Sequence, residues 1–596
     1  MADSPLLDAE GVVRVSISSN GNALPETASL VSLSVQRAIN MVPTARLVFN
    51  DGDMPEQSFP LSDTDELKPG AAIKVSAGYG NDETTIFEGV VIKHSLRVAG
   101  NNDARLVVEC RDKAVAMTIG RCNANFVDQT DSDIIGKLIS AHGLTADVES
   151  TSVQFGELVQ YYCSDWDYLL SRADANGLLV AVTDGTVAVK SPDASAEPVL
   201  TVSYGLDLIE FQAEMDARTQ FASAQATSWD MKTQAVVQGT AASPETLNAQ
   251  GNLDSATLAK VIALDSYRLQ TAAPVLKESL TGWAKAQQRK AALARLRGRI
   301  RFQGSAKTKL GSLIELVGVG QRFSGKVFVG AFTHEIADGN WITEVEFGLS
   351  PAWFTERPDV MSRPAAGLVP GVEGLQIGVV KKLDADPDGE QRIQVSVPVM
   401  QAATDGVWAR LASLHGSKGF GTFFIPEVGD EVILGYFNND PSYPVILGSL
   451  YSSQRAPAYA LAAENDTKAI VTRSKLKLEF DEKDKVITIT TPGNNKIVLS
   501  DKDKSILLQD QNSNKVELAP GGITLDSPKD IKLTAKGTIT VDAVGAITIS
   551  SKADVKSSGL NVNCEAQVGF VGKGSATAEL SASGQTTVKG AMVMIN

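Results

Sequence analysis

Few residues of this chain suit catalytic, metal-binding or disulfide chemistry. Its 596 residues include only four histidines and four cysteines. The cysteines lack the CxxC spacing of zinc sites, so they predict reduced thiols rather than a disulfide framework. No histidine stands with a Ser or Cys in a recognisable nucleophile motif. The sequence therefore predicts a protein that is not an enzyme, with no catalytic residues, no cofactor and no metal site.

Long apolar runs and an excess of basic residues are also missing. No apolar run approaches the length of a membrane span, and residues 1–10 lack the basic and apolar regions of a signal peptide. With 70 acidic and 55 basic residues, the net charge is −15. This balance argues against nucleic acid as a main partner, because phosphate binding needs basic patches. We expect a soluble protein made in the cytoplasm, and its low aromatic content of 6% with abundant Gly, Ser, Thr and Val favours β-structure.

A repeat of eight residues dominates residues 521–557. Apolar residues recur every eight positions, a second series follows two positions behind, and glycines precede several repeats. Each octad therefore predicts a short strand and a tight turn. The apolar positions that we expect in a shared core are Ile523, Leu525, Ile531, Leu533, Ile539, Val541, Ile547, Ile549 and Val555.

An octad is too narrow to bury its own apolar face. It offers two large apolar side chains, and a lone ribbon of such strands leaves both its face and its edges open. We therefore predict that three copies of the chain wind together into a triangular prism around one apolar axis. The alternative is an antiparallel meander packed on another domain, although repeats of this regularity are typical of arrays.

Residues 1–370 alternate apolar and polar residues in many short runs, which predicts β-barrels or sheets with tight turns. Helical spacing appears in 131–141, with Asp131 or Ser132 as the expected N-cap, and in 165–176, which stops at Gly177. A further basic helix is expected over 283–296, ended by Gly298, with its charges on a solvated face. Residues 371–455 contain five short predicted strands with Gly/Pro turns, which suggests a small OB-type barrel.

Several motifs carry a resemblance to one family. Residues 78–91 (GY, then IFEGVV) and 160–177 (QYY, then SDWDYL) resemble the hub of contractile-tail proteins. The pair GTFFIPEVGDEV at 421–432 and NDPSYPVILG at 439–448 closely resembles the OB module of type VI secretion VgrG spikes and of related phage baseplate and extracellular injection-particle spikes.

The resemblance implies a mainly β protein with tandem hub barrels, an OB collar and an intertwined trimeric β-helix. The domains expected are a hub at 1–370, a collar at 371–455, a linker at 456–465 and a spike at 466–596. The partners implied are two further copies of the chain, a hexameric inner-tube protein, baseplate proteins, effector cargo, a target membrane and a PAAR-type tip protein. This tip protein would cover the apolar end formed by Val588, Met592, Met594 and Ile595. On firing, the spike would be expelled into the medium or a target cell.

Two motifs of known chemistry are incomplete. Residues 320–326 have Walker A spacing, but Val327 stands where Ser or Thr must reach magnesium. The DxDxDG run at 384–389 begins like a calcium loop, but Val395 replaces its bidentate glutamate. Two other functions stay open from the residues alone: a cell-wall hydrolase within 1–365, and a glycan-binding adhesin.

Overall fold

The computed structural model describes residues 3–7, 9, 11–100, 103–193, 195–401 and 405–595. Strands account for 38% of the chain and helices for 11%, so the predicted mainly β class is confirmed. The chain divides into two compact units, Met1–Leu450 and Tyr451–Asn596. No described helix is long and apolar enough to cross a membrane.

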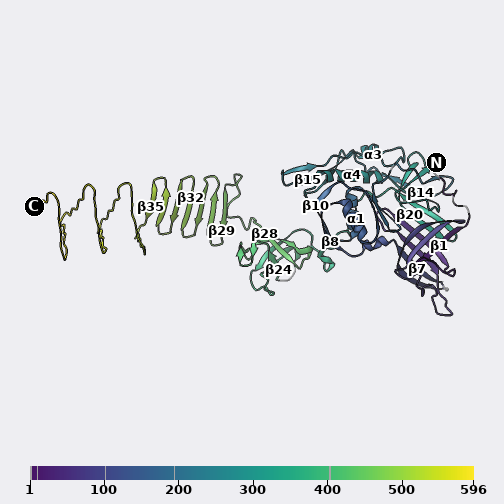
Figure 1. Ribbon diagram of the computed structural model, residues 1–596, viewed down its shortest axis with the longest axis horizontal. Coiled ribbons are helices and arrows are strands. Elements are labelled where there is room, and N and C mark those ends of the chain that lie inside the picture. Colours follow the sequence, from purple (N-terminus) through teal and green to yellow (C-terminus); the bar gives the residue numbers. More distant parts are fainter. Residues whose placement is uncertain are drawn as a thin grey trace. The chain divides into compact units, whose positions relative to one another are not determined.

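A 13-stranded sheet forms the main part of the first unit (Figure 1). Its order is β14-β18-β21-β20-β3-β4-β7-β6-β5-β1-β2, with β19 paired to β20 and β13 paired to β19. The strands are β1 (Val13–Ser19), β2 (Asn22–Ala23), β3 (Leu30–Ala38), β4 (Thr44–Asn50), β5 (Ala72–Tyr79), β6 (Asp82–Ala99), β7 (Asp103–Arg111), β13 (Leu200–Ser203), β14 (Leu208–Met215), β18 (Leu296–Gln303), β19 (Leu313–Val317), β20 (Gly325–Ala337) and β21 (Asn340–Phe347).

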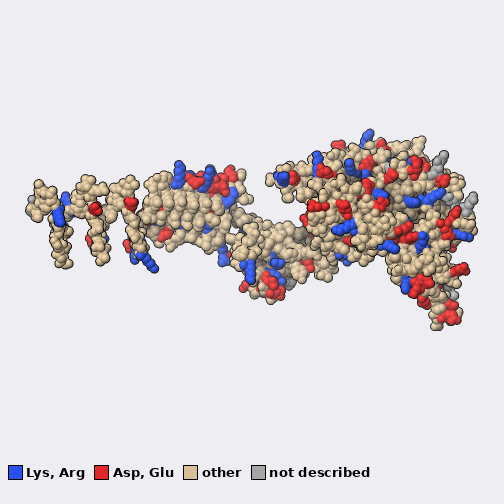
Figure 2. Space-filling model, viewed as in Figure 1, with Lys and Arg blue, Asp and Glu red and all other residues tan. Residues whose placement is uncertain are grey.

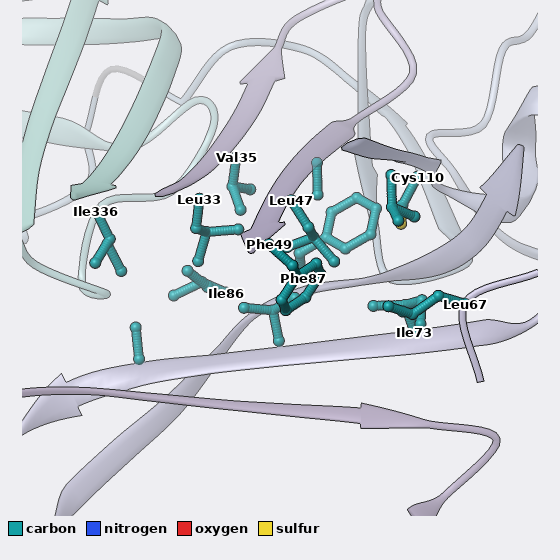
Figure 3. Packing of buried hydrophobic residues seen from close by; sticks show 14 of the residues in the cluster. Leu33, Val35, Leu47, Phe49, Leu67, Ile73, Ile86, Phe87, Cys110 and Ile336 are labelled. Carbon is teal, nitrogen blue, oxygen red and sulfur yellow. The ribbon is translucent and has the colours of Figure 1, made fainter. Parts of the chain in front are cut away.

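The sheet encloses two separate apolar cores. In β1 to β7, alternate side chains such as Val35, Leu47 and Phe87 point inward, because successive residues of a strand face opposite sides. Figure 3 shows these side chains converging, with Ile336 joining them from β20. A second core gathers around Phe302 in the β13 to β21 half. The antiparallel pair β3 and β20 joins the halves.

A mixed α/β lobe carries a third core. Its elements are η1 (Lys113–Thr118), β8 (Cys122–Thr130), α1 (Asp131–Ala141), β9 (Thr145–Val148), β10 (Gln154–Cys163), α2 (Asp165–Ala175), β11 (Leu179–Thr183) and β12 (Thr186–Lys190). Both predicted helices are present, but the N-cap of α1 is Thr130, which forms a capping box with Asp133. Helix α2 is capped by Ser164 and is followed by Gly177 at φ +66°.

The predicted basic helix is longer than expected and is not solvated along its charged face. The excursion contains β15 (Ala224–Asp230), β16 (Ala235–Gln238), α3 (Ser255–Ile262), β17 (Tyr267–Gln270) and α4 (Lys277–Ala294). Lys290 of α4 lies 2.6 Å from Asp174 and 4.9 Å from the ring centroid of Trp353. Arg289 bonds to the Gly177 carbonyl oxygen at 3.1 Å. These charges attach α4 to the neighbouring lobe, so the prediction of a solvated face was wrong.

Gly298 does not end this helix. Arg295 is the C-cap of α4, and Gly298 lies inside strand β18. A Cβ atom at this position would lie 2.2 Å from the Gln212 carbonyl oxygen and 2.6 Å from the Phe347 ring. The glycine therefore permits two strands to approach each other closely. From the local sequence alone, a glycine in this role looks the same as one that ends a helix.

The predicted OB barrel is confirmed as a closed five-stranded barrel, β22-β23-β24-β28-β27. Its core contains Val380, Val395 and Leu434. The elements are β22 (Gln376–Lys382), β23 (Ile393–Ser396), η4 (Pro398–Met400), β24 (Val407–Leu411), β25 (Gly416–Ser417), β26 (Phe420–Gly421), β27 (Glu431–Tyr436), η5 (Phe437–Asn439) and β28 (Pro444–Ser449), preceded by η2 (Phe354–Glu356) and η3 (Pro364–Gly367).

The second unit is an antiparallel ladder followed by chain without assigned strands. The ladder runs in chain order from β29 to β35 (Figure 1). Its strands are β29 (Thr467–Val471), β30 (Lys477–Asp481), β31 (Val486–Thr490), β32 (Lys496–Ser500), β33 (Ser505–Gln509), β34 (Lys515–Ala519) and β35 (Gly522–Asp526). Only the first octad forms a strand. The octad strands predicted beyond residue 526 are absent from the described part of this single chain. In that segment the backbone N–H and C=O groups would need a neighbouring strand as their hydrogen-bond partner.

Candidate self-association face

Each ladder strand is five residues long, and every strand from β30 to β35 places two apolar side chains on one face, whereas β29 places one there, Ile470. The second and fourth residues of a strand share a face because side chains alternate. The antiparallel register then aligns these residues across neighbouring strands. One column contains Phe480, Ile487, Leu499, Ile506, Leu518 and Ile523, and the other contains Ile470, Leu478, Ile489, Ile497, Leu508, Val516 and Leu525.

Tight turns hold this register. Lys485, Asn494, Lys504 and Ser513 adopt positive φ between successive strands, and Asp481 accepts a hydrogen bond from the Asp484 backbone N–H at 2.9 Å. Such Asx turns fix the chain reversal locally. The two apolar columns are therefore set by short-range interactions, before any partner is considered.

The opposite face and the turns carry most of the charges. Lys477 and Glu479 lie 2.9 Å apart, and Lys515 and Glu517 lie 3.3 Å apart. Hydrogen bonds from Tyr459 and then Lys477 lower the pKa of Glu479. Figure 2 shows the ladder as a broad uncharged surface with charged side chains gathered along one long edge.

The described part of the chain leaves most side chains of the apolar columns exposed. Ile489, Ile497 and Leu508 are 45%, 38% and 43% exposed. A groove runs beside them, and its lining includes Val516, Leu525 and Ile531. A large contiguous apolar surface of this kind marks an interaction site in a soluble protein.

The octad positions singled out from the sequence are still more open. Ile523, Leu525, Ile531, Leu533, Ile539, Val541, Ile547, Ile549 and Val555 are 52–78% exposed. Ile523 and Leu525 continue the two columns on β35. The ladder residues from Ile470 to Leu518 belong to the same face but were not among the predicted core positions. Their signal was an alternation with a period of about ten residues, which is less regular than the octads.

The residues predicted at the apolar end are also exposed. Val588, Met592, Met594 and Ile595 are 65%, 80%, 78% and 91% exposed. They lie in the part of the second unit that has no assigned strand. Their side chains are thus available for an intermolecular contact.

The two incomplete motifs are occupied by structural contacts. Strand β20 begins at Gly325, so the Walker-like run leads into a strand rather than a helix. In the acidic turn, Arg392 forms a bidentate contact with Asp386, with a shortest distance of 2.6 Å. The hydrogen bond from Arg392 lowers the pKa of Asp386. The Arg392 guanidinium, rather than a metal ion, therefore neutralises Asp386 at this turn. The described residues contain no cluster of three or more His, Cys, Asp or Glu able to hold a metal ion.

Three family models match the chain in succession. The Alg8 N-terminal domain matches residues 9–338, the type VI secretion system/phage-baseplate injector OB domain matches 376–451, and the phage baseplate V C-terminal trimerisation domain matches 486–553. A hub sheet, an OB barrel and a ladder with a bare apolar face define a structural protein of the injection-spike class. The chain belongs to the family of the Alg8 N-terminal domain, which covers more than half of it, and is a VgrG-like spike protein.

Individual relatives share short stretches with the chain. The type VI secretion system spike protein VgrG5 of Pseudomonas aeruginosa is 33% identical over 108 residues, 17% of this chain and 14% of that protein. VgrG3 of Vibrio cholerae is 31% identical over 134 residues, 21% of this chain and 12% of that protein. The matched stretches thus span about an eighth of these curated relatives. The solved type VI secretion component c3393 of Escherichia coli overlaps 73% of this chain and 99% of its own, with 14% identity and a TM-score of 0.36.

Proposed function

We propose that this chain is the hub and spike of a contractile injection apparatus and acts as a homotrimer. The observation that carries the proposal is the double apolar column of the ladder, which the chain builds but does not cover. Burying a large aliphatic side chain contributes roughly 1.5–3 kcal/mol. An array of such residues therefore favours association strongly, and another copy of the same ladder repeats its apolar residues with the same spacing.

Three copies suit this geometry. Three narrow faces close a triangular prism, in which each copy directs its columns toward the common axis. Past residue 526 the backbone groups need partners, and the neighbouring copies supply them in such a prism. The match of residues 486–553 to a domain described as a trimerisation domain supports this number. Within this proposal, the nine octad residues line the axis.

The hub and collar have positions implied by the family resemblance. The hub connects the spike to a hexameric inner tube and to the baseplate, and the two sheet cores of each copy would give six similar units in a trimer. The OB barrel acts as a collar between hub and spike. The work of puncturing a target membrane comes from the contractile sheath, so the chain supplies stiffness and carries cargo rather than catalysing a reaction.

The apolar end at 588–595 binds a PAAR-type tip protein in this proposal. Met592→Asp places a charge among the exposed apolar residues and should abolish capture of the purified tip protein by the full-length chain. Thr586→Asp, which adds the same charge six positions earlier, is the matched control and should preserve capture. Equal capture by both variants would remove 588–595 from the proposed contact.

The oligomeric state of the full-length chain tests the proposal. Sedimentation equilibrium should give three times the mass of the chain, and residues 466–595 should resist proteolysis in that state. A well-folded monomer whose C-terminal unit is compact and protease-resistant would overturn it. Copurification with a sheath and a tube from the native source would establish the apparatus.

A further inference from the structure

Two of the four cysteines stand directly opposite each other at the base of the β8–β10 ribbon. Cys122 is the first residue of β8 and Cys163 is the last residue of β10, and they are register partners in this antiparallel pair. Opposite residues of an antiparallel pair project to the same face with Cα atoms about 4.5 or 5.5 Å apart. Both spacings lie within the Cα range of disulfides, about 4.4–6.8 Å. The register of this pair is therefore compatible with the backbone spacing of a disulfide.

Local contacts hold the two strands in this register. The chain bulges between Gln160 and Cys163, and Tyr162 adopts a positive φ of 44° there. The Tyr162 backbone N–H donates to Asn123 Oδ1 at 2.9 Å, and Arg121 Nη1 donates to the Tyr162 carbonyl oxygen at 2.9 Å. The bulge is thus tied to Asn123 of β8 and to Arg121, which directly precedes that strand, and Cys163 follows it as the register partner of Cys122.

The pair differs from the other two cysteines in its access to solvent. Cys122 is exposed and Cys163 is partly exposed, and both are free thiols in the structure. Cys110 is buried in the hub core, where burial raises its pKa to about 12. Cys564 is exposed in the second unit, far along the chain from any other cysteine. Only the ribbon pair combines a facing partner with access for a soluble oxidant.

Acidic side chains surround the pair. The Asp165 carboxylate accepts a hydrogen bond from Gln160 Nε2 at 2.9 Å, and its other oxygen lies 2.8 Å from His142 Nε2. Burial and then Asp165 raise the pKa of Cys122. Burial and then Asp167 raise the pKa of Cys163, and Arg121 opposes this rise. Both thiols are therefore mainly protonated at neutral pH, and they react slowly there because the thiolate is the nucleophile.

We propose that Cys122 and Cys163 form an intramolecular disulfide by exchange with a low-molecular-weight disulfide such as oxidised glutathione. One thiol loses its proton, and its sulfur attacks the glutathione disulfide, releasing one glutathione thiolate. The second cysteine then attacks the mixed disulfide and releases the other. The two cysteines are oxidised together, and one glutathione disulfide is reduced to two glutathione molecules after proton uptake.

The bond staples the ribbon beside the start of helix α2. It closes the loop formed by residues 122–163, which contains β8, α1, β9 and β10. A crosslink across a loop of this length restricts the unfolded chain substantially. The modification does not require the proposed trimer, so its failure and the failure of the spike proposal are separate results.

The test uses the full-length chain with Cys564→Ser, which removes the exposed cysteine of the second unit. After incubation with oxidised glutathione at pH 8, non-reducing peptide mapping should give one crosslinked species that contains both Cys122 and Cys163 and lacks two hydrogens. The thermal midpoint of the hub should rise by on the order of 5 °C, and dithiothreitol should reverse the rise. Adding Cys122→Ser or Cys163→Ser should leave a glutathione adduct on the remaining thiol and no rise.

Asp165→Asn provides a second readout that a merely structural cysteine pair would not give. Removing the charge should lower the pKa of Cys122, so crosslinking at pH 7 should become several-fold faster than in the parent protein. The crosslinking rates of the variant and the parent protein should converge at high pH, where the cysteines of both proteins are ionised to thiolates. Crosslinks between copies of the chain, or stable glutathione adducts on both cysteines of the folded protein without a crosslink, would overturn the proposal.

Discussion

The hub sheet and the C-terminal ladder are both antiparallel, and both alternate apolar and polar residues, yet only the hub buries its apolar side. Val35 and Phe302 of the hub have no exposed surface, whereas Ile497 of the ladder is 38% exposed. Hub strands reach 18 residues in β6, and ladder strands have five. The same period-two pattern therefore gives a closed core in one unit and an open face in the other.

Strand length and covering elements explain this difference. A long twisted sheet folds over itself and receives loop residues such as Leu61 and Leu67, so the hub completes two cores within one chain. The ladder strand is too short to curl around two apolar columns, and no helix was assigned among the described residues of the second unit. An alternating pattern establishes which face is apolar, while strand length and surrounding chain decide whether a partner is needed.

The largest expected effect is the loss of the trimer in Ile497→Asp. The substitution places a carboxylate in an apolar column, where three copies would bring three charges toward one axis. Burying unpaired charges is strongly unfavourable. Sedimentation equilibrium should give a monomer at concentrations at which the parent chain is trimeric, while the circular dichroism of the hub should be retained.

Val498→Asp is the matched control, because it makes a similar change one residue later on the opposite face of β32. Val498 pairs across the strands with Thr488 and Leu507 rather than with the apolar columns. This variant should remain trimeric. If both variants assembled equally, or if both failed, the assignment of the association face would be wrong.

The second prediction concerns the self-contained core of the hub. Phe302 is fully buried among Ile300, Val345 and Phe347. Phe302→Ala removes most of this side chain and leaves a cavity, so the free energy of hub unfolding should fall by about 3–5 kcal/mol. Chemical denaturation followed by near-ultraviolet circular dichroism measures the loss.

Dependence on protein concentration then separates the two units. Hub unfolding should have the same midpoint across a hundred-fold dilution, whereas the unfolding of the ladder should shift because its buried face requires other copies. A hub midpoint that moved in parallel with that of the ladder would show that the hub core also depends on association.

The sequence predicted elements well wherever local signals decide. Helix α1 has the predicted bounds, and α2 ends one residue before the predicted end because Gly177 accepts the left-handed backbone that follows. The cap of α1 was missed although a local signal existed: Thr130 and Asp133 have capping-box spacing. Gly298 was misassigned because only the distant Gln212 and Phe347 explain why a side chain is excluded there.

The association face could be predicted only in part. The octads identified Ile523 and Leu525 because their eight-residue period is strict. The ladder columns around Ile497 and Leu508 were not predicted, because turns of unequal length make the spacing of their apolar residues irregular. Strands beyond residue 526 were predicted from alternation within the eight-residue repeat. A strand also requires a hydrogen-bonded neighbour, and a single chain does not supply one there.

A third prediction concerns a buried ion pair of the hub lobe. Arg172 Nε and Nη2 lie 2.6 and 2.9 Å from the two oxygens of Asp131, whose side chain is almost fully buried. Asp131→Ala leaves a guanidinium without its carboxylate and should destabilise the lobe by about 3 kcal/mol. Differential scanning calorimetry of the trimer checks this loss.

The exposed pair of Asp216 and Arg218 is the control for this measurement. Its atoms are equally close, at 2.6 Å, but Arg218 is 82% exposed. Asp216→Ala should therefore change the thermal midpoint little, because solvent screens such pairs. Similar losses in both variants would show that burial does not set the strength of these ion pairs.

The smallest expected effect is the loss of hub stability for each unit of pH. We expect this pH dependence in the hub and not in the ladder. His334 is a buried residue of β20, with Nδ1 2.9 Å from Oγ1 of Thr343 on the neighbouring strand β21. Burial, followed by the charge of Arg37, lowers its pKa from 6.5 to about 3. The folded hub thus holds the imidazole neutral, while the unfolded chain takes up a proton below pH 6.5. Hub stability should fall by about 1.4 kcal/mol for each pH unit from about 6.5 toward 3.

The window from pH 6.5 to 5 suits this measurement, because most carboxylates titrate lower. His334→Gln should flatten the slope there, whereas His415→Gln, in the OB barrel, should leave it unchanged. Residues 451–596 contain no histidine, so sedimentation should show the same oligomer across this window. An unchanged slope in His334→Gln would mean that another group carries the proton. A ladder that dissociated in the same window would mean that its association depends on the hub, and the two units could no longer be treated as separately stabilised.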